Sequence, residues 1–145
     1  MPNTMVDERA LRDLVDGYAA AADAGDSEAF TQLFLPEATL SARRGDEAPA
    51  VYVGSARLAE IPARLARYRR TFHVVTNHRF EIEGDIATGG ALCQAHHVSD
   101  GDGGATDLVL TISYHDRYAR TAAGWRFATR DVHILWTAEH PVTMF

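Results

Sequence analysis

The sequence predicts an α+β fold, in which a strongly curved, mostly antiparallel sheet wraps as a cone around three helices and one internal pocket. Apolar residues recur at helical spacing only in the first half of the chain. The second half is a series of long segments rich in Val, Ile, Thr and aromatic residues. Helices followed by consecutive strands are typical of α+β proteins, whereas a parallel α/β sheet needs the two to alternate. A sheet bent this strongly encloses a pocket.

The 145 residues are the length of one domain, and we assign residues 1–145 to it. The formal net charge of −6 at pH 7 argues against a nucleic-acid partner and against an anionic membrane surface, because both need a field of Lys and Arg. The single cysteine, Cys93, is interpreted as a small buried side chain and suits a reducing cytoplasm, where we expect the protein. The chain begins without a recognisable signal peptide, and its apolar runs are shorter than the ~20 residues of a membrane span.

Two helices are predicted near the N-terminus. Residues 7–22 carry apolar side chains at helical spacing, and Gly25 is a plausible end for this helix. A second, short helix is expected to begin with Asp26 or Ser27 as its cap and to end at Pro36.

Two short strands and a third helix follow. The strands are predicted at residues 38–43 and 52–53, on either side of a turn. The third helix opens at Gly54 and carries an apolar stripe as far as Tyr68. Pro62 inside it is expected either to lie in a first turn or to cause a kink.

The rest of the chain predicts four long strands in two hairpins, at residues 71–83, 86–98, 106–120 and 125–137. Gly84-Asp85 is a two-residue hairpin turn, and Gly89-Gly90 indicates a bulge or bend. Residues 99–105 are expected to form a polar, Gly-rich loop.

Three segments resemble the SnoaL-like proteins of the nuclear-transport-factor-2-like superfamily. YAAAADAGDSEAFTQLFLPEATL is similar to their first two helices and first strand, TFHVVTN to their third-strand motif, and YHDRYARTAAGWRFATRD to their closing hairpin. Scytalone dehydratase, hexachlorocyclohexane dehydrochlorinase and bile acid 7-alpha dehydratase share this arrangement. The resemblance implies the cone-shaped fold and a lyase that uses no cofactor. It leaves other functions open, because polyketide cyclases and the noncatalytic small subunits of ring-hydroxylating dioxygenases belong to the same family.

The resemblance also implies a catalytic pair, Asp23 at the end of the first helix and His73 in the TxH motif. Tyr18 and Arg130 match a Tyr and an Arg that bile acid 7-alpha dehydratase also uses. A carboxylate at the C-terminal end of a helix opposes the helix dipole, and an imidazolium next to Asp23 would compensate for it. The structural alternative for Asp23 is an exposed residue in a helix-ending turn.

The other candidates also have structural alternatives. His73 lies in an apolar strand, where a hydrogen-bonded core histidine is the ordinary reading. Tyr18 lies on the apolar stripe of its helix and fits a core tyrosine. The structural alternative for Arg130 is an ion pair with Asp116 or Asp131.

The strand register points to a second histidine. If Gly84-Asp85 is a two-residue turn, then His73 lies opposite His96, and opposed residues share a sheet face. The resemblance supports this, because scytalone dehydratase has a second pocket histidine on the same strand. A bulge at Gly89-Gly90 would shift the register by one residue and put His97 in the pocket instead. The remaining alternative is that His96 is a surface histidine.

The expected pocket walls suit a small apolar cyclic molecule. The residues expected to form them are Phe34, Phe72, Leu92, Leu110, Ile134 and Trp136.

The predicted reaction is a dehydratase-type β-elimination with His73 as general base and Asp23 setting its tautomer. The other polar candidates would hydrogen-bond a carbonyl or the leaving oxygen. A cyclase or isomerase using the same proton transfer, and a noncatalytic ligand-binding or accessory subunit, are the alternatives. We expect no cofactor and no metal, because the sequence has no HxxxH or CxxC spacing and no Gly-rich phosphate loop followed by a helix.

The outer face of the sheet and the C-terminal tail predict self-assembly. Strict alternation puts Val74, Val109, Trp125, Phe127 and Leu135 on the outer face, an apolar patch that a monomer would not leave in water. We therefore expect a homo-oligomer. The resemblance implies a trimer or a dimer, because the related enzymes are commonly trimers and dimers are frequent in the wider class. The tail, residues 138–145, is expected to pack over the pocket or a neighbouring subunit.

Overall fold

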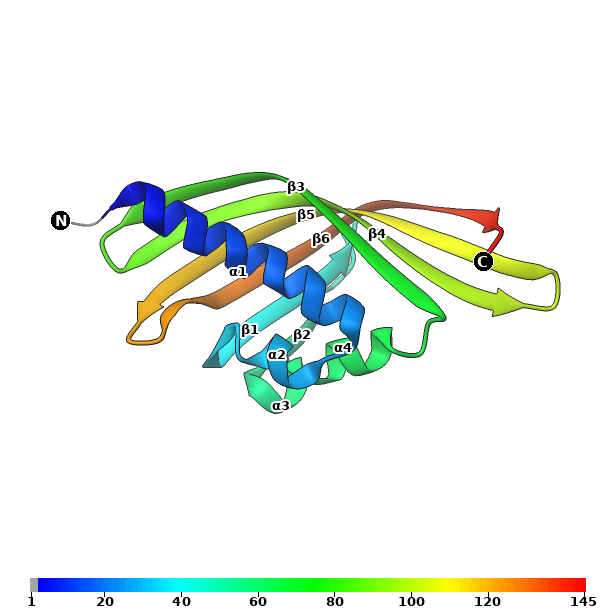
Figure 1. Ribbon diagram of the computed structural model, residues 1–145, viewed down its shortest axis with the longest axis horizontal. Helices are drawn as coiled ribbons and strands as arrows, with labels where there is room; N and C mark the ends of the chain where they lie inside the picture. The colour runs from blue at the N-terminus through cyan, green and yellow to red at the C-terminus, as the bar shows by residue number, and fades with distance from the viewer. Residues whose placement is uncertain (1–2) are drawn as a thin grey trace.

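The computed structural model describes residues 3–145. Its elements are, in order, α1 (Thr4–Ala24), α2 (Ser27–Thr31), β1 (Phe34–Arg44), β2 (Ala50–Val53), α3 (Gly54–Leu58), α4 (Glu60–Leu65), β3 (Arg70–Glu83), β4 (Ile86–Gly101), β5 (Gly104–Thr121) and β6 (Gly124–Val142). The strands form one sheet in the order β2-β1-β6-β5-β4-β3, with β1 and β6 parallel and the other neighbours antiparallel. Figure 1 shows α1 crossing one face of the curved sheet, with the short helices gathered near its C-terminal end. The predicted α+β fold class is confirmed.

Helix α1 is held at both ends. The side chain of Asn3 caps its N-terminus, and Gly25 ends it in the left-handed conformation (φ 65°). In its first turn, Asp7 accepts hydrogen bonds from both terminal nitrogens of Arg120 (2.6 and 3.0 Å) and from the indole of Trp125 (3.0 Å). These bonds fix α1 to the hairpin of β5 and β6. None of the described helices is long and apolar enough to cross a membrane.

The boundaries of α2 and β1 differ from those predicted. Asp26 caps α2, with its carboxylate accepting from the backbone N–H of Ala29 at 3.0 Å. The helix then ends at Thr31, and the next strand starts at Phe34 instead of residue 38. Pro36 lies inside β1, which is possible because the pairing of β1 with β6 is interrupted between Phe34 and Thr39.

The third predicted helix is divided into α3 and α4. Pro62 lies in the first turn of α4, where its missing N–H breaks no helical hydrogen bond. The break comes just before α4, at Ala59, so the apolar stripe continues over two short helices. Tyr68 lies beyond the end of α4.

The strands β4, β5 and β6 are longer than predicted. The expected loop at residues 99–105 is a tight turn between Gly101 and Gly104, and residues 138–142 pair with β5. Figure 1 shows the three strand ends projecting together beyond the helices. Residues 138–142 thus extend the sheet and do not line the cavity of their own chain, so that half of the prediction for the tail is wrong; packing of the tail against a neighbouring subunit stays a prediction.

One extra residue in β3 sets the register of the sheet. The pairing of β3 with β4 shifts between Thr76 and Arg79, and Asn77 between them has a φ of 57°. Asn tolerates this left-handed conformation better than other residues with a Cβ. The irregularity that we expected at Gly89-Gly90 therefore lies on the opposite strand.

Gly89 and Gly90 have a different structural role. Both are regularly paired, and a Cβ at Gly89 would lie 2.1 Å from the carbonyl oxygen of Arg79. A Cβ at Gly90 would lie 2.3 Å from the carbonyl oxygen of Tyr114. No side chain fits at these distances, so the two glycines allow the neighbouring strands to approach.

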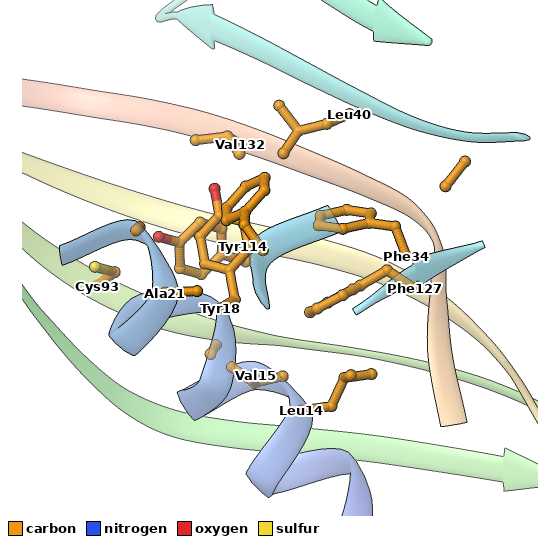
Figure 2. Close-up of a cluster of buried hydrophobic side chains, with 14 of the residues drawn as sticks. Leu14, Val15, Tyr18, Ala21, Phe34, Leu40, Cys93, Tyr114, Phe127 and Val132 are labelled. Atoms are coloured by element: carbon orange, nitrogen blue, oxygen red, sulfur yellow. The ribbon is translucent and has the colours of Figure 1, made fainter. Parts of the chain in front are cut away.

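The core lies between α1 and the sheet. Figure 2 shows side chains of α1 pointing toward Phe34, Tyr114 and Phe127. Phe127 and Trp125 belong to this buried face, and the prediction that they lie on the outer face is wrong. The physical reason is a second register shift, between Arg117 and Tyr118 of β5, which leaves an extra residue in β6 and reverses the alternation.

Candidate active site

An apolar cavity of about 150 Å³ lies on the inner side of the sheet, below α4 and the C-terminal half of α1. Leu110 and Ile134 line it, as expected. Its polar groups come from three tyrosines and two histidines: Tyr18, Tyr52, Tyr114, His73 and His97.

Four of the predicted wall residues lie elsewhere. Phe34 is buried in the core, with its ring stacked 4.9 Å from that of Phe127. Phe72, Leu92 and Trp136 lie on the outer face and are 60%, 42% and 61% exposed. Neighbouring residues of a strand face opposite sides of the sheet. Because His73 points inward to the cavity, Phe72 beside it points outward.

Asp23 and His73 are in direct contact. Oδ1 of Asp23, in the last turn of α1, lies 2.6 Å from Nδ1 of His73, near the start of β3. The backbone N–H of His73 donates to Oδ2 of the same carboxylate at 3.0 Å, and the hydroxyl of Thr71 donates to Oδ1 at 2.9 Å. The carboxylate is thus fixed by three groups of one strand.

This contact determines which nitrogen of His73 is basic. A carboxylate only accepts hydrogen bonds, so Nδ1 carries a hydrogen, and Nε2 is the nitrogen with the free lone pair in the neutral ring. Within residues 3–145, Nε2 of His73 has no hydrogen-bond partner. The imidazole is therefore oriented by Asp23 and free to accept a proton on its other nitrogen.

The Asp23 carboxyl is stabilised in its ionised form. Burial by itself would raise its pKa, but the hydrogen bonds from the side chain and backbone of His73 and from Thr71 outweigh it, and the pKa lies below its ordinary value. The last turn of α1 has no basic residue to balance a carboxylate, whose repulsion by the helix dipole costs about 0.3–1 kcal/mol. The contacts from β3 provide the compensation.

The second histidine of the cavity is His97, and the prediction of His96 in the pocket is wrong. Thr71 pairs with His97 and Phe72 with His96, because of the extra residue in β3. His97 therefore shares the inner face with His73, and the centres of their rings are 5.9 Å apart. The alternative that put His97 in the pocket is therefore correct. It assumed a bulge at Gly89-Gly90 of β4, whereas the extra residue lies in β3.

His97 is a neutral, buried imidazole. Its ring lies tilted against that of Tyr68, with the ring centres 4.7 Å apart, and its Nε2 is buried with no hydrogen-bond partner in the described chain. Burial, and the positive charge that His73 carries when it is protonated, lower the pKa of His97 to about 4. At neutral pH this ring is therefore uncharged.

His96 faces the opposite side of the sheet. Its Nδ1 lies 2.6 Å from Oδ2 of Asp107, and its side chain is 28% exposed. His140 lies 3.8 Å from the same carboxylate oxygen. In the described part of the chain, no three His, Cys, Asp or Glu side chains are grouped closely enough to hold a metal ion.

Tyr18 and Arg130 lie next to each other, and only Tyr18 lines the cavity. Burial raises the pKa of Tyr18 to about 12, partly offset by the charge of Arg130, so its hydroxyl stays protonated. Arg130 is wholly buried and donates from Nε and Nη2 to the carboxylate of Asp116 at 2.9 and 3.2 Å. This is the structural ion pair that we considered as the alternative for Arg130.

Sequence reasoning missed two groups of the site. Thr71 is the first residue of the TxH motif, and residues that alternate along a strand share a face, so its contact with Asp23 could have been inferred. Tyr114 follows Leu110 by four residues on the same strand. Residues at even spacing share a sheet face, so Tyr114 also points to the cavity. Cys93 is buried, as expected, and burial raises the pKa of its thiol.

A family model for the SnoaL-like domain matches residues 3–131. The chain belongs to the SnoaL-like family. This confirms the resemblance seen in the sequence. A comparison with curated proteins gives no match.

Solved structures show the same fold as this SnoaL-like protein. The Kfla4162 protein of Kribbella flavida is 22% identical, with a TM-score of 0.81 over 94% of this chain and 95% of the other. A provisionally named scytalone dehydratase of Novosphingobium aromaticivorans is 18% identical, with a TM-score of 0.80 over 97% and 91%. A hexachlorocyclohexane dehydrochlorinase of Novosphingobium barchaimii is 16% identical, with a TM-score of 0.80 over 98% and 95%. At these levels of identity, the likenesses show a shared fold.

Proposed function

We propose that this protein is a cofactor-independent lyase that carries out a dehydratase-type β-elimination on a small apolar cyclic substrate. The observation that carries the proposal is the contact of 2.6 Å between Asp23 and His73, on a histidine whose ring lines an apolar cavity. The names of the dehydratase and dehydrochlorinase relatives support the same class of reaction.

The elimination begins with His73 as general base. Its Nε2 takes a proton from the carbon next to a carbonyl group, and the electron pair of that C–H bond forms a new C=C bond. The adjacent carboxylate of Asp23 stabilises the imidazolium that results. As the C=C bond to the β-carbon forms, the β-hydroxyl leaves with the electron pair of its C–O bond, receives the proton from His73 and departs as water, so the base is regenerated.

The cavity sets the size of the substrate. A cavity of about 150 Å³ lined by apolar side chains accommodates a single six-membered ring. Tyr18 lines the cavity and stays protonated at neutral pH, which supports a role for it as hydrogen-bond donor to the substrate. The second imidazole available to the substrate is that of His97 instead of His96.

The test uses 3-hydroxycyclohexanone, with the conjugated enone product followed by its absorbance. Wild-type protein is expected to form the enone. His73→Gln is expected to lower the rate by at least about 10²-fold, the usual contribution of a general base. Asp23→Asn is expected to lose less, because the imidazole remains and only its orientation is weakened.

A matched control comes from the outer face. His96 makes an equally short contact with a carboxylate but lies outside the cavity, so His96→Gln is expected to keep the wild-type rate. Exchange of the α-protons of cyclohexanone for deuterium, followed by NMR, separates the alternatives. Exchange without elimination from any cyclic β-hydroxy ketone indicates an isomerase or cyclase. Binding of the ketone with no exchange indicates a noncatalytic ligand-binding or accessory subunit and contradicts the proposal.

A further inference from the structure

A second hollow lies next to the cavity, at the C-terminal end of α1. It has a volume of about 480 Å³ and is bordered by the last turn of α1, the end of α4 and the first residues of β3. Figure 1 shows α4 and the start of β3 beside this end of α1. Leu65 of α4 lines both the cavity and the hollow, so the two spaces are neighbours.

Two pairs of side chains complete the wall between these spaces. In the first pair, the carboxylate of Asp23 borders the hollow and the imidazole of His73 borders the cavity. In the second pair, Tyr68 borders the hollow and His97 borders the cavity, with their ring centres 4.7 Å apart. One aromatic side chain therefore separates the hollow from the second imidazole of the cavity.

The chain on either side of Tyr68 holds its ring against His97. Helix α4 ends at Leu65, and the backbone N–H of Tyr68 donates to the carbonyl oxygen of Leu65 at 3.1 Å, which makes a tight turn. On the other side, Nη1 of Arg69 lies 2.7 Å from Oδ1 of Asp100 in β4. The turn and the ion pair together position the half-buried tyrosine between the helices and the sheet.

The state of His97 indicates that the wall is closed at this point. Its residue is 9% exposed, and its Nε2 is buried with no hydrogen-bond partner in residues 3–145. A polar atom that bordered an open hollow would be hydrated instead, because water is its ordinary partner. Burial is also the largest of the causes that lower the pKa of His97 to about 4.

We propose that Tyr68 is a specificity-determining residue, which closes the cavity toward the hollow and so limits it to ligands with a single ring. An apolar cavity of about 150 Å³ accommodates one six-membered ring. A second, fused ring needs the space that the side chain of Tyr68 occupies. The size limit concerns binding; the identification of the bound ring with a substrate rests on the proposed function.

The test compares the binding of cyclohexanone with that of 2-decalone, which has two fused six-membered rings and the same carbonyl group. Equilibrium affinities are measured by NMR from the ring hydrogens of His73 and His97, assigned with His73→Gln and His97→Gln. Additional methylene groups strengthen binding about tenfold or more in a cavity that accommodates them. Wild-type protein is nevertheless expected to bind 2-decalone no more tightly than cyclohexanone.

Substitutions of Tyr68 join the two spaces or keep them apart. Tyr68→Ala is expected to bind 2-decalone at least about tenfold more tightly than wild type, and cyclohexanone within about threefold of wild type. Tyr68→Phe is the matched control, because it keeps the ring and removes only the hydroxyl, and its affinities are expected to stay within about twofold. Tyr68→Leu leaves a smaller opening and is expected to gain at least about threefold for 2-decalone, so it decides the question if Tyr68→Ala does not fold.

A pH titration of the same NMR signals gives a second readout. In Tyr68→Ala, the ring of His97 becomes accessible to water from the hollow, so its pKa is expected to rise from about 4 toward the 6.5 of the free group. In Tyr68→Phe the pKa of His97 is expected to remain at its wild-type value. The charged groups that also influence this pKa are the same in all of these proteins: His73, Asp23, Asp107 and His96.

Four results would overturn the proposal. The wild-type protein binds neither ketone, or it binds 2-decalone more tightly than cyclohexanone. Tyr68→Ala and Tyr68→Leu both keep the wild-type affinity for 2-decalone, or both lose cyclohexanone binding. Tyr68→Phe gains as much affinity for 2-decalone as Tyr68→Ala does. None of these measurements needs turnover, so a protein that shows the size limit but forms no enone from 3-hydroxycyclohexanone would retain the role of Tyr68 and contradict only the proposed function.

Discussion

At the residue scale, the candidate site depends on which side chains share a face of β3. Thr71 and His73 alternate along that strand, so both meet the carboxylate of Asp23, and the intervening Phe72 points to the other side of the sheet. The same rule on β4 puts His97 in the cavity and His96 outside it. Residues 3–145 therefore contain three short His–carboxylate contacts, those of His73 with Asp23, His78 with Asp16 and His96 with Asp107, and of these the contact between His73 and Asp23 lies at the apolar cavity.

Replacing His97 by Gln is expected to reduce the acid sensitivity of the protein. The pKa of His97 is about 4 in the folded state, against 6.5 for the free group, so the unfolded chain binds the proton more readily. The contribution of neutral His97 to stability is therefore complete above pH 6.5 and is lost as the pH falls toward 4. Urea denaturation at about pH 7 and about pH 4.5 measures it. His97→Gln should lose less free energy of unfolding between these two values than wild type; an equal loss in both proteins would contradict the prediction.

At the scale of secondary-structure elements, single extra residues determine what each strand presents. Asn77 in β3 adds one residue and brings His97 to the inner face. Phe127 and Arg130 are three residues apart in β6, so strict alternation would put them on opposite faces of the sheet. The extra residue between them brings both to the buried face. A strand can therefore change its buried face partway along its length.

Substitution at Asn77 tests this directly. Asn77→Gly is expected to keep stability within about 0.5 kcal/mol, because glycine adopts a positive φ without strain. Asn77→Val should cost about 1–2 kcal/mol or more, since a β-branched residue is strained there. Denaturant unfolding compares the two. If Val were tolerated as well as Gly, the backbone at this position would not require the left-handed conformation.

The sequence predicted the order of elements, the hairpin at Gly84-Asp85 and the meeting of Asp23 with His73, the last through the family resemblance. It could not predict the positions of Phe127 and His97. Alternation along a strand predicts only whether a residue shares a sheet face with its odd-numbered or its even-numbered neighbours. One extra residue in the strand exchanges the two faces for every residue beyond it. Asn77 carries no sign of its bulge beyond a tolerance for left-handed backbone, whereas Gly89-Gly90, which looked like a bulge, serves close strand packing.

At the scale of the whole molecule, the outer face of the sheet carries exposed apolar side chains. They are Phe72, Val74, Leu92, Leu135 and Trp136, each at least 38% exposed in the single chain. Burial of such side chains contributes roughly 25 cal/mol per Å² of apolar surface. The projecting ends of β4, β5 and β6 extend the same face beyond the helices (Figure 1).

We therefore expect a homo-oligomer, a trimer in preference to a dimer, assembled through this face. Light scattering at micromolar concentration should give a mass above that of one chain for wild type, and Phe72→Asp or Trp136→Asp should shift it toward the monomer. Met5→Asp serves as the control, because Met5 is also an exposed apolar side chain, even more exposed than Phe72 and Trp136, but lies on α1. A monomeric wild type would contradict this prediction.

Gly90 does not line the cavity, but it limits how the cavity can change through substitutions. A methyl group there would lie 2.3 Å from the backbone oxygen of Tyr114, so even alanine requires β5 to move away, together with the tyrosine that it carries. The shape of the cavity therefore depends on a residue that does not line it. Side chains such as Leu110 and Ile134 line the cavity directly, so their replacement changes its shape and leaves the spacing of the strands unchanged.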